Sequence, residues 1–137
     1  MAEKMSFIVF SGSADKLQAV ATMVSGAAAM GVETHLFLTF WGLNAFRKDM
    51  VGQPLPMSSE AGDMAEMMGK LMMEKGVPPW SSVLADAIDI GDVHVHACAM
   101  TMDLMEMPKE ALVDMVEDVI GVGRFIELSA GGSVVFI

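Results

Sequence analysis

Short apolar runs alternate with longer segments of helical periodicity along this chain. The runs that predict β-strands cover residues 5–10, 34–40, 93–98, 116–120 and 133–137. The first of them, MSFIVF, is apolar almost throughout, which is typical of a strand buried on both faces of a parallel sheet.

The segments between these runs carry helix signals. Leu17, Val20 and Val24 recur at helical spacing, with Ser13 placed to cap that helix and Gly31 placed to end it. Further helices are predicted over residues 43–50, from 58 or 59 to 76, over 82–90, after 101, from 108, and past 123. Alternating strands and helices imply parallel pairing with right-handed crossovers, so the predicted fold class is α/β.

Composition and charge indicate one domain and exclude several classes of partner. The 137 residues, 53% of them hydrophobic and without a repeat or linker, predict a single domain over 1–137. A net charge of -10 repels nucleic acid and anionic lipid, so neither nucleic acid nor a membrane is expected as a partner. No uncharged run reaches the ~18–20 strongly apolar residues of a membrane span. A single cysteine suits a reducing compartment, and we expect a cytoplasmic location.

That cysteine, Cys98, is the first candidate for chemistry. It is the last residue of a predicted strand, and the carboxyl ends of parallel strands are where ligands and reactive groups collect. A helical turn follows directly, and a helix N-terminus lowers the pKa of a thiol and binds anions. Asp103 and Glu106 would raise that pKa if they faced the thiol. A buried, inert cysteine is the alternative interpretation.

Two histidines share the face of the strand that carries Cys98, because side chains alternate with period two. His94 and His96 suggest a metal site, but positions two apart on a strand lie ~6.5 Å apart and no second ligand cluster completes a tetrahedral set. Hydrogen-bonded or interface histidines are therefore the favoured interpretation, and no metal is predicted. His35, on the preceding strand, is a candidate for the same polar patch.

Methionine is unusually frequent, with 16 residues. One helical face combines Met64, Met67, Met68, Leu71 and Met72. We favour packing of this face on the core or on another subunit. Copper binding by thioethers is an alternative. Another is a mobile lid over Cys98, whose opposite edge would be lined by Met100, Met102, Met105 and Met107.

The loop over residues 11–16, SGSADK, joins the first strand to the first helix and is able to hold an anion. It lacks the glycines of a Walker loop or a dinucleotide fingerprint. Because the first and third strands are often neighbours in such sheets, we expect this loop to form one wall of a pocket that faces Cys98.

Three segments together resemble the DsrE-like (DsrE/DsrF-like) sulfur-relay family. They are residues 11–16 (SGSADK), 36–43 (LFLTFWGL) and 97–105 (ACAMTMDLM). The narrower resemblance is to a subgroup with a TFWGL and a CxM[ST]M segment. It spans roughly residues 5–50 and 92–137 and is weakest across the methionine-rich stretch.

The resemblance implies a flavodoxin-like parallel sheet of about five strands with helices on both faces, and a homo-oligomer. It implies that Cys98 accepts and passes on sulfane sulfur, with Met100, Thr101 and Met102 as its flanking segment and Trp41 as the family tryptophan. Rhodanese-like or disulfide oxidoreductase partners would act in trans, and we expect no cofactor.

The predicted function is a cysteine persulfide carrier or sulfurtransferase. In this hypothesis Ser11 or Ser13 contacts the sulfur donor, and Trp41 and the methionines limit the access of water. One alternative is a non-catalytic subunit that binds a nucleotide or flavin in a flavodoxin-like pocket. Another is an oligomeric adaptor whose methionine-rich helix is its interface.

Overall fold

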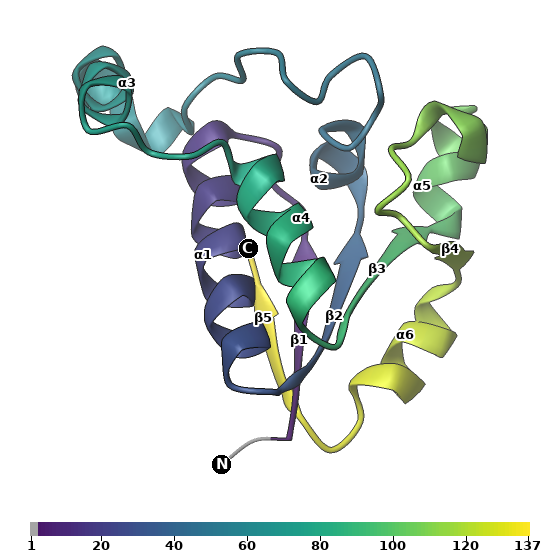
Figure 1. Ribbon diagram of the computed structural model, residues 1–137. Helices are drawn as coiled ribbons and strands as arrows, with labels where there is room; N and C mark the ends of the chain where they lie inside the picture. The colour runs from purple at the N-terminus through teal and green to yellow at the C-terminus, as the bar shows by residue number, and fades with distance from the viewer. Residues whose placement is uncertain (1–2) are drawn as a thin grey trace.

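The computed structural model describes residues 3–137, so the first two residues of the predicted domain lie outside the described part. Its sheet has five parallel strands in the order β4-β3-β2-β1-β5 (Figure 1). The strands are β1 (Lys4–Val9), β2 (Glu33–Leu38), β3 (Val93–Cys98), β4 (Asp118–Ile120) and β5 (Ser133–Phe136). This confirms the predicted class, an α/β fold with a parallel sheet of five strands.

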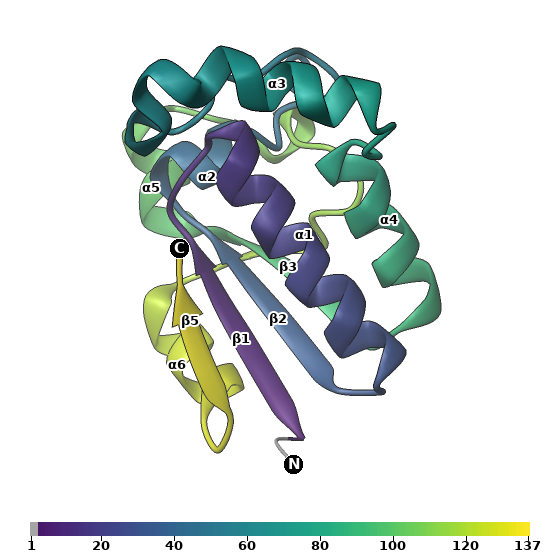
Figure 2. The same cartoon turned by 90° about the vertical axis from the view of Figure 1, so that its left-hand side faces the viewer.

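Helices lie on both faces of the sheet (Figures 1 and 2). On one face α1 (Ala14–Ala29) and α4 (Trp80–Ile90) pack side by side. On the other face α6 (Val122–Ser129) packs against β1 and β2. The remaining helical segments are α2 (Phe40–Asn44), η1 (Ser59–Met64), α3 (Ala65–Glu74), α5 (Ala99–Leu104) and η2 (Lys109–Ala111).

The two faces of the sheet differ in composition because side chains alternate along each strand. Beneath α1 and α4 the strands contribute fully buried apolar residues, which form the main core: Phe7, Val9, Leu36, Leu38, Val95 and Ala97. The opposite face carries most of the polar and reactive residues of the strands: Ser6, His35, His94, His96 and Cys98. Helix α6 covers the Cys98 end of this second face.

The strand order corrects one expectation. The prediction that the first and third strands are neighbours is wrong, because β2 lies between β1 and β3. Since α1 and α4 pack against each other on one face, the two crossovers that they form move the chain in the same direction across the sheet. The resulting order also differs from the 2-1-3-4-5 order of flavodoxin itself.

The turn after β2 begins earlier than the apolar run indicated. The strand ends at Leu38 and α2 begins at Phe40, whose φ of 47° lies in the left-handed region that bulky residues rarely adopt. Gly42 is required two residues later, because a Cβ there would collide with the backbone carbonyl of Val9. The local sequence thus allows α2 to pack tightly on the end of β1.

The methionine-rich segment does not pack on the core. Packing on the core was one of the two interpretations that the sequence favoured, and the structure contradicts it. Every residue of α3 is at least partly exposed, and the helix projects from the body of the molecule in Figure 1. Met64, Met68 and Met72 instead line an open groove of about 800 Å³ against α1. Within residues 3–137, no helix is both long enough and apolar enough to cross a membrane.

Candidate functional site

Cys98 ends β3 and occupies the N-cap position of α5. Its side chain is 5% exposed, in an apolar cluster with Phe37 of β2 and Phe125 of α6. The two aromatic rings stack with their centroids 4.7 Å apart, and Ile8 and Ile120 pack against the same cluster. The prediction of a thiol at the strand end is therefore correct in position, but this thiol is covered rather than exposed.

Two buried threonines bring hydroxyl groups together at the end of β3. Thr39 follows β2 and Thr101 lies in the first turn of α5, with their Oγ1 atoms 3.0 Å apart. The backbone N–H of Phe40 donates to Thr101 Oγ1 over 3.2 Å. The unusual backbone conformation of Phe40 thus aims an N–H group at this cluster, which ties the turn after β2 to the helix after β3.

These groups determine the acidity of the thiol. Burial raises the pKa of Cys98, but hydrogen bonds from the hydroxyl and N–H of Thr101, the hydroxyl of Thr39 and the N–H of Met100 outweigh it. The net pKa of Cys98 is lowered, so a larger fraction is thiolate at neutral pH than for an unperturbed cysteine. Asp103 and Glu106, which would oppose this effect, are solvent-exposed.

The structure divides the predicted site residues into two groups. The first group lies around Cys98. Thr101 lies beside the thiol, and Met100 contributes its backbone N–H. Met100 itself is 54% exposed. Met102 is buried in the main core, so it does not line an open pocket as proposed.

The second group lies around the end of β1. Ser11, Ser13 and Trp41 line a cavity of about 450 Å³ between α2 and the loop of residues 50–59. Among the residues that the structure describes, those that line this cavity do not include Cys98. The predicted wall facing Cys98 is therefore not formed, because β2 separates the ends of β1 and β3. Ser13 occupies the N-cap position of α1, yet its hydroxyl makes no capping hydrogen bond.

Two functional neighbours of Cys98 were missed from the sequence. Thr39 belongs to the TFWGL segment, but no role was assigned to it, although its place near the carboxyl end of a predicted strand was a usable signal. Phe125 approaches Cys98 from a helix 27 positions further along the chain. Nothing local in the sequence indicates that contact, because it depends on α6 crossing to the second face of the sheet.

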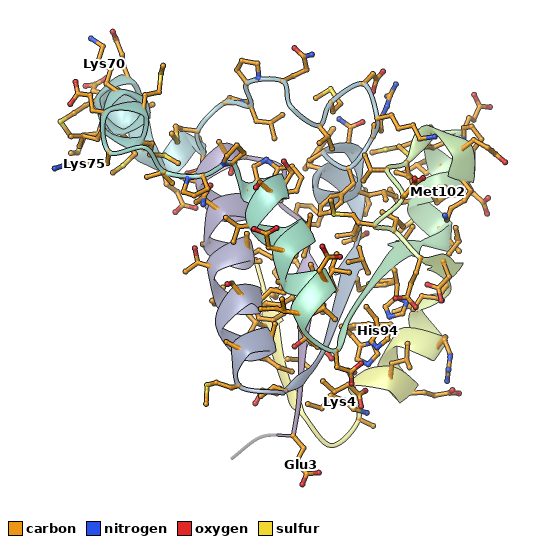
Figure 3. All side chains as sticks on the ribbon, viewed as in Figure 1. Glu3, Lys4, Lys70, Lys75, His94 and Met102 are labelled. Atoms are coloured by element: carbon orange, nitrogen blue, oxygen red, sulfur yellow. The ribbon has the colours of Figure 1, made fainter. Side chains whose placement is uncertain are left out.

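The three histidines form one cluster on the face that carries Cys98. His35 Nδ1 lies 2.9 Å from His96 Nε2, and the stacked rings of His35 and His94 have centroids 5.1 Å apart. This places His35 in the patch, as the sequence suggested. In Figure 3, His94 lies lower along the sheet than Met102, which lies beyond the carboxyl end of β3. Ligand atoms of His96, Glu117 and Asp118 all lie within 4.8 Å of one another.

The fold matches that of a solved protein from Methanobacterium thermoautotrophicum. MTH1491, a protein of unknown function, superposes with a TM-score of 0.60 over 98% of each chain, at 19% identity. This likeness identifies the class of fold: a five-stranded parallel sheet flanked by helices.

The chain belongs to the DsrE/DsrF/DrsH-like family, whose model matches residues 1–64 and 50–136. It is 31% identical to the sulfur carrier protein DsrE2 of Allochromatium vinosum, over 93% of this chain and 92% of that protein. It is 30% identical to the uncharacterized protein YrkE of Bacillus subtilis, over 96% of this chain and 94% of that protein. The predicted family is thereby confirmed, while the narrower subgroup stays a prediction.

Proposed function

We propose that this protein carries sulfane sulfur as a persulfide on Cys98 and transfers it to an acceptor thiol. The observation that carries the proposal is the set of polar groups at the end of β3, where the hydroxyls of Thr39 and Thr101 and the backbone N–H groups of Thr101 and Met100 lower the pKa of the thiol. Polar groups that stabilise a thiolate at this strand end also favour the negative charge of a persulfide formed there. Membership of a family that includes a named sulfur carrier supports the same conclusion.

The reaction is an exchange at sulfur in two steps. The Cys98 thiolate attacks the outer sulfur of a donor persulfide, a Cys98–sulfur bond forms, and the donor's S–S bond breaks. The donor leaves as a thiolate, and the proton stays with the transferred sulfur. The thiolate of an acceptor then attacks that sulfur and releases Cys98 as a thiolate. The two steps together involve no net oxidation, so no cofactor is required.

Burial of Cys98 adds a condition to this mechanism. A side chain that is 5% exposed cannot meet a protein-borne donor until its cover moves. Phe125 contributes to that cover from α6, a helix of eight residues. We propose that a donor and an acceptor, both acting in trans, reach Cys98 when α6 shifts. A rhodanese-like or disulfide oxidoreductase protein fits these roles, and a homo-oligomer is the proposed assembly.

Intact-protein mass spectrometry after incubation with polysulfide or thiosulfate tests the proposal. We expect the protein to gain one or more sulfur atoms, and dithiothreitol to remove them. The matched control is Cys98→Ser, which keeps a small polar side chain at the N-cap and should gain none. A thiol that iodoacetamide alkylates but that no sulfane donor modifies would contradict the proposal.

The cavity around Ser11, Ser13 and Trp41 favours a second candidate, a subunit that binds a nucleotide or flavin. It lies at the end of β1 and the start of α1, apart from Cys98. Purified protein that carries a bound chromophore, unchanged in Cys98→Ser, would support that function. Ligand-free protein that takes up sulfur would leave the persulfide carrier as the better account.

A further inference from the structure

A cluster of imidazoles and carboxylates joins β3 to the edge strand β4. His96 and Asp118 are paired across the two strands, and Glu117 directly precedes Asp118. Ligand atoms of these three residues all lie within 4.8 Å of one another. The cluster is independent of the thiol chemistry, since Cys98 lies in the apolar cluster with Phe37 and Phe125.

The hydrogen bonds of the buried His96 ring leave one of its nitrogens facing an acceptor. Glu33 is a carboxylate and accepts from His35 Nε2 over 2.7 Å, which makes His35 Nδ1 an acceptor in the neutral tautomer. His96 Nε2, 2.9 Å from His35 Nδ1, must then be the donor. In the neutral tautomer of His96, Nδ1 then presents a lone pair toward Asp118 Oδ1, 2.6 Å away.

A divalent ion beside His96 Nδ1 and Asp118 Oδ1 would accept a lone pair from each, and it also brings in the second carboxylate, Glu117. Two carboxylates and one neutral imidazole balance the charge of such an ion, which is a donor set typical of Zn²⁺ and related metals.

We propose that His96 Nδ1, Glu117 and Asp118 bind a divalent first-row transition metal ion of the Zn²⁺ class. Three protein ligands leave a fourth position open to water or a further ligand. Zinc–ligand distances of about 2.0–2.2 Å require these donor atoms to lie roughly 3–3.5 Å apart, which small side-chain rotations achieve. Because β4 has only three residues, the ion also fastens this short edge strand to β3.

The residues around the three ligands orient them as the outer shell of a metal site does. The chain from Glu33 through His35 fixes the tautomer and the ring orientation of His96. His94 Nδ1 lies 2.9 Å from Glu117 Oε1, and its Nε2 lies 2.7 Å from Asp92 Oδ1. These contacts hold Glu117 beside the ring of His96. The three ligands therefore have fixed orientations, which scattered surface carboxylates lack.

Titration of the metal-free full-length protein with Co²⁺, followed by visible absorption, tests the site, and equilibrium dialysis with Zn²⁺ gives the stoichiometry. We expect one ion per chain and a higher melting temperature on binding. Asp118→Asn and Glu117→Gln should each weaken binding at least about tenfold, whereas Asp114→Asn, an exposed control carboxylate, should not. All three variants alter exposed or half-exposed side chains, so the fold should persist.

The same titration on Cys98→Ser separates the site from the thiol. We expect unchanged affinity and a cobalt spectrum without the near-ultraviolet band of a thiolate ligand. Three results would overturn the proposal: no saturable binding of either ion, equal affinity in Asp118→Asn and Asp114→Asn, or loss of binding in Cys98→Ser.

Discussion

Strand β3 has two faces that differ in their chemistry although they share one backbone. Val93, Val95 and Ala97 pack beneath α1 and α4, where their side chains make apolar contacts in the main core. On the other face, His96 and Cys98 are buried to a similar degree but depend on hydrogen bonds from neighbouring strands and from α5. The comparison teaches that burial on the second face is combined with hydrogen bonds, which together set the pKa of Cys98 and the orientation of His96.

The largest expected effect separates chemistry from stability on the second face. Cys98→Ser should abolish sulfur uptake completely, because the attacking sulfur is lost. Its melting temperature should remain close to that of the unmodified protein, because the serine hydroxyl still fits the N-cap of α5. Mass spectrometry and calorimetry measure the two properties. Residual sulfur on the variant would show that another group carries it.

On the core face, a substitution should affect stability alone. Leu36→Ala removes a fully buried side chain from β2 and should lower the free energy of unfolding by about 2–5 kcal/mol. Met73→Ala, at a side chain that is 84% exposed, is the control and should change it by less than about 0.5 kcal/mol. Urea denaturation measures both. Equal effects would contradict the placement of α3 outside the core.

A smaller effect should follow from removing one donor to the thiol. Thr101→Val keeps the shape of the side chain but removes a hydroxyl that lowers the pKa of Cys98. The rate of alkylation by iodoacetamide rises with pH as the thiol ionises. In the unmodified protein we expect the midpoint of this rise to lie below the value of about 8.5 for a free thiol. In Thr101→Val we expect the midpoint to lie at a higher pH than in the unmodified protein. The exposed Thr22→Val is the control. An unchanged midpoint would show that the Thr101 hydroxyl does not lower the pKa of Cys98.

The same shift makes stability depend on pH in a defined direction. The pKa of Cys98 is lower in the folded than in the unfolded protein, so ionisation favours the folded state above the unfolded pKa. That contribution is lost as the pH falls through the folded pKa. The stability difference between the protein and Cys98→Ser should therefore shift in favour of the cysteine as pH rises. Urea denaturation across this range measures it, and an opposite slope would contradict the lowered pKa.

The smallest expected effect concerns access to the thiol. Phe125→Leu reduces the side chain that covers Cys98 and should increase the rate of alkylation severalfold. Ile126→Leu, on an exposed position of the same helix, should leave the rate unchanged. Alkylation that is quenched at set times and followed by mass spectrometry measures the rate in both variants. Equal rates would indicate that the opening that admits reagents lies elsewhere, for example at α5.

Much of the strand and helix pattern could be predicted, because it depends on local periodicity. The bounds of β3 were predicted correctly, and with them the position of Cys98 at a strand end before a helix. The limits of the second strand were not, because Phe40 adopts a left-handed conformation that its residue type disfavours. In that conformation the N–H of Phe40 donates to Thr101 Oγ1, and two residues later Gly42 packs closely on the backbone of Val9. No local pattern in the sequence predicts either contact.

The methionine-rich segment shows a second limit of local patterns. Its spacing correctly predicted a helix with one apolar face. It did not indicate what that face meets, because an amphipathic helix is equally consistent with a core, a groove or another subunit. In the structure that face borders an open groove beside α1.

By itself, the sequence determined the α/β class, the family, and which residues share a face of each strand, because these follow from composition, motifs and a period of two. Only the tertiary structure decided the strand order. That order separates Ser11 and Trp41 from Cys98, and it brings Asp118 beside His96. The physical reason is that pairing between distant strands depends on how the crossover helices pack together, and no single segment encodes that packing.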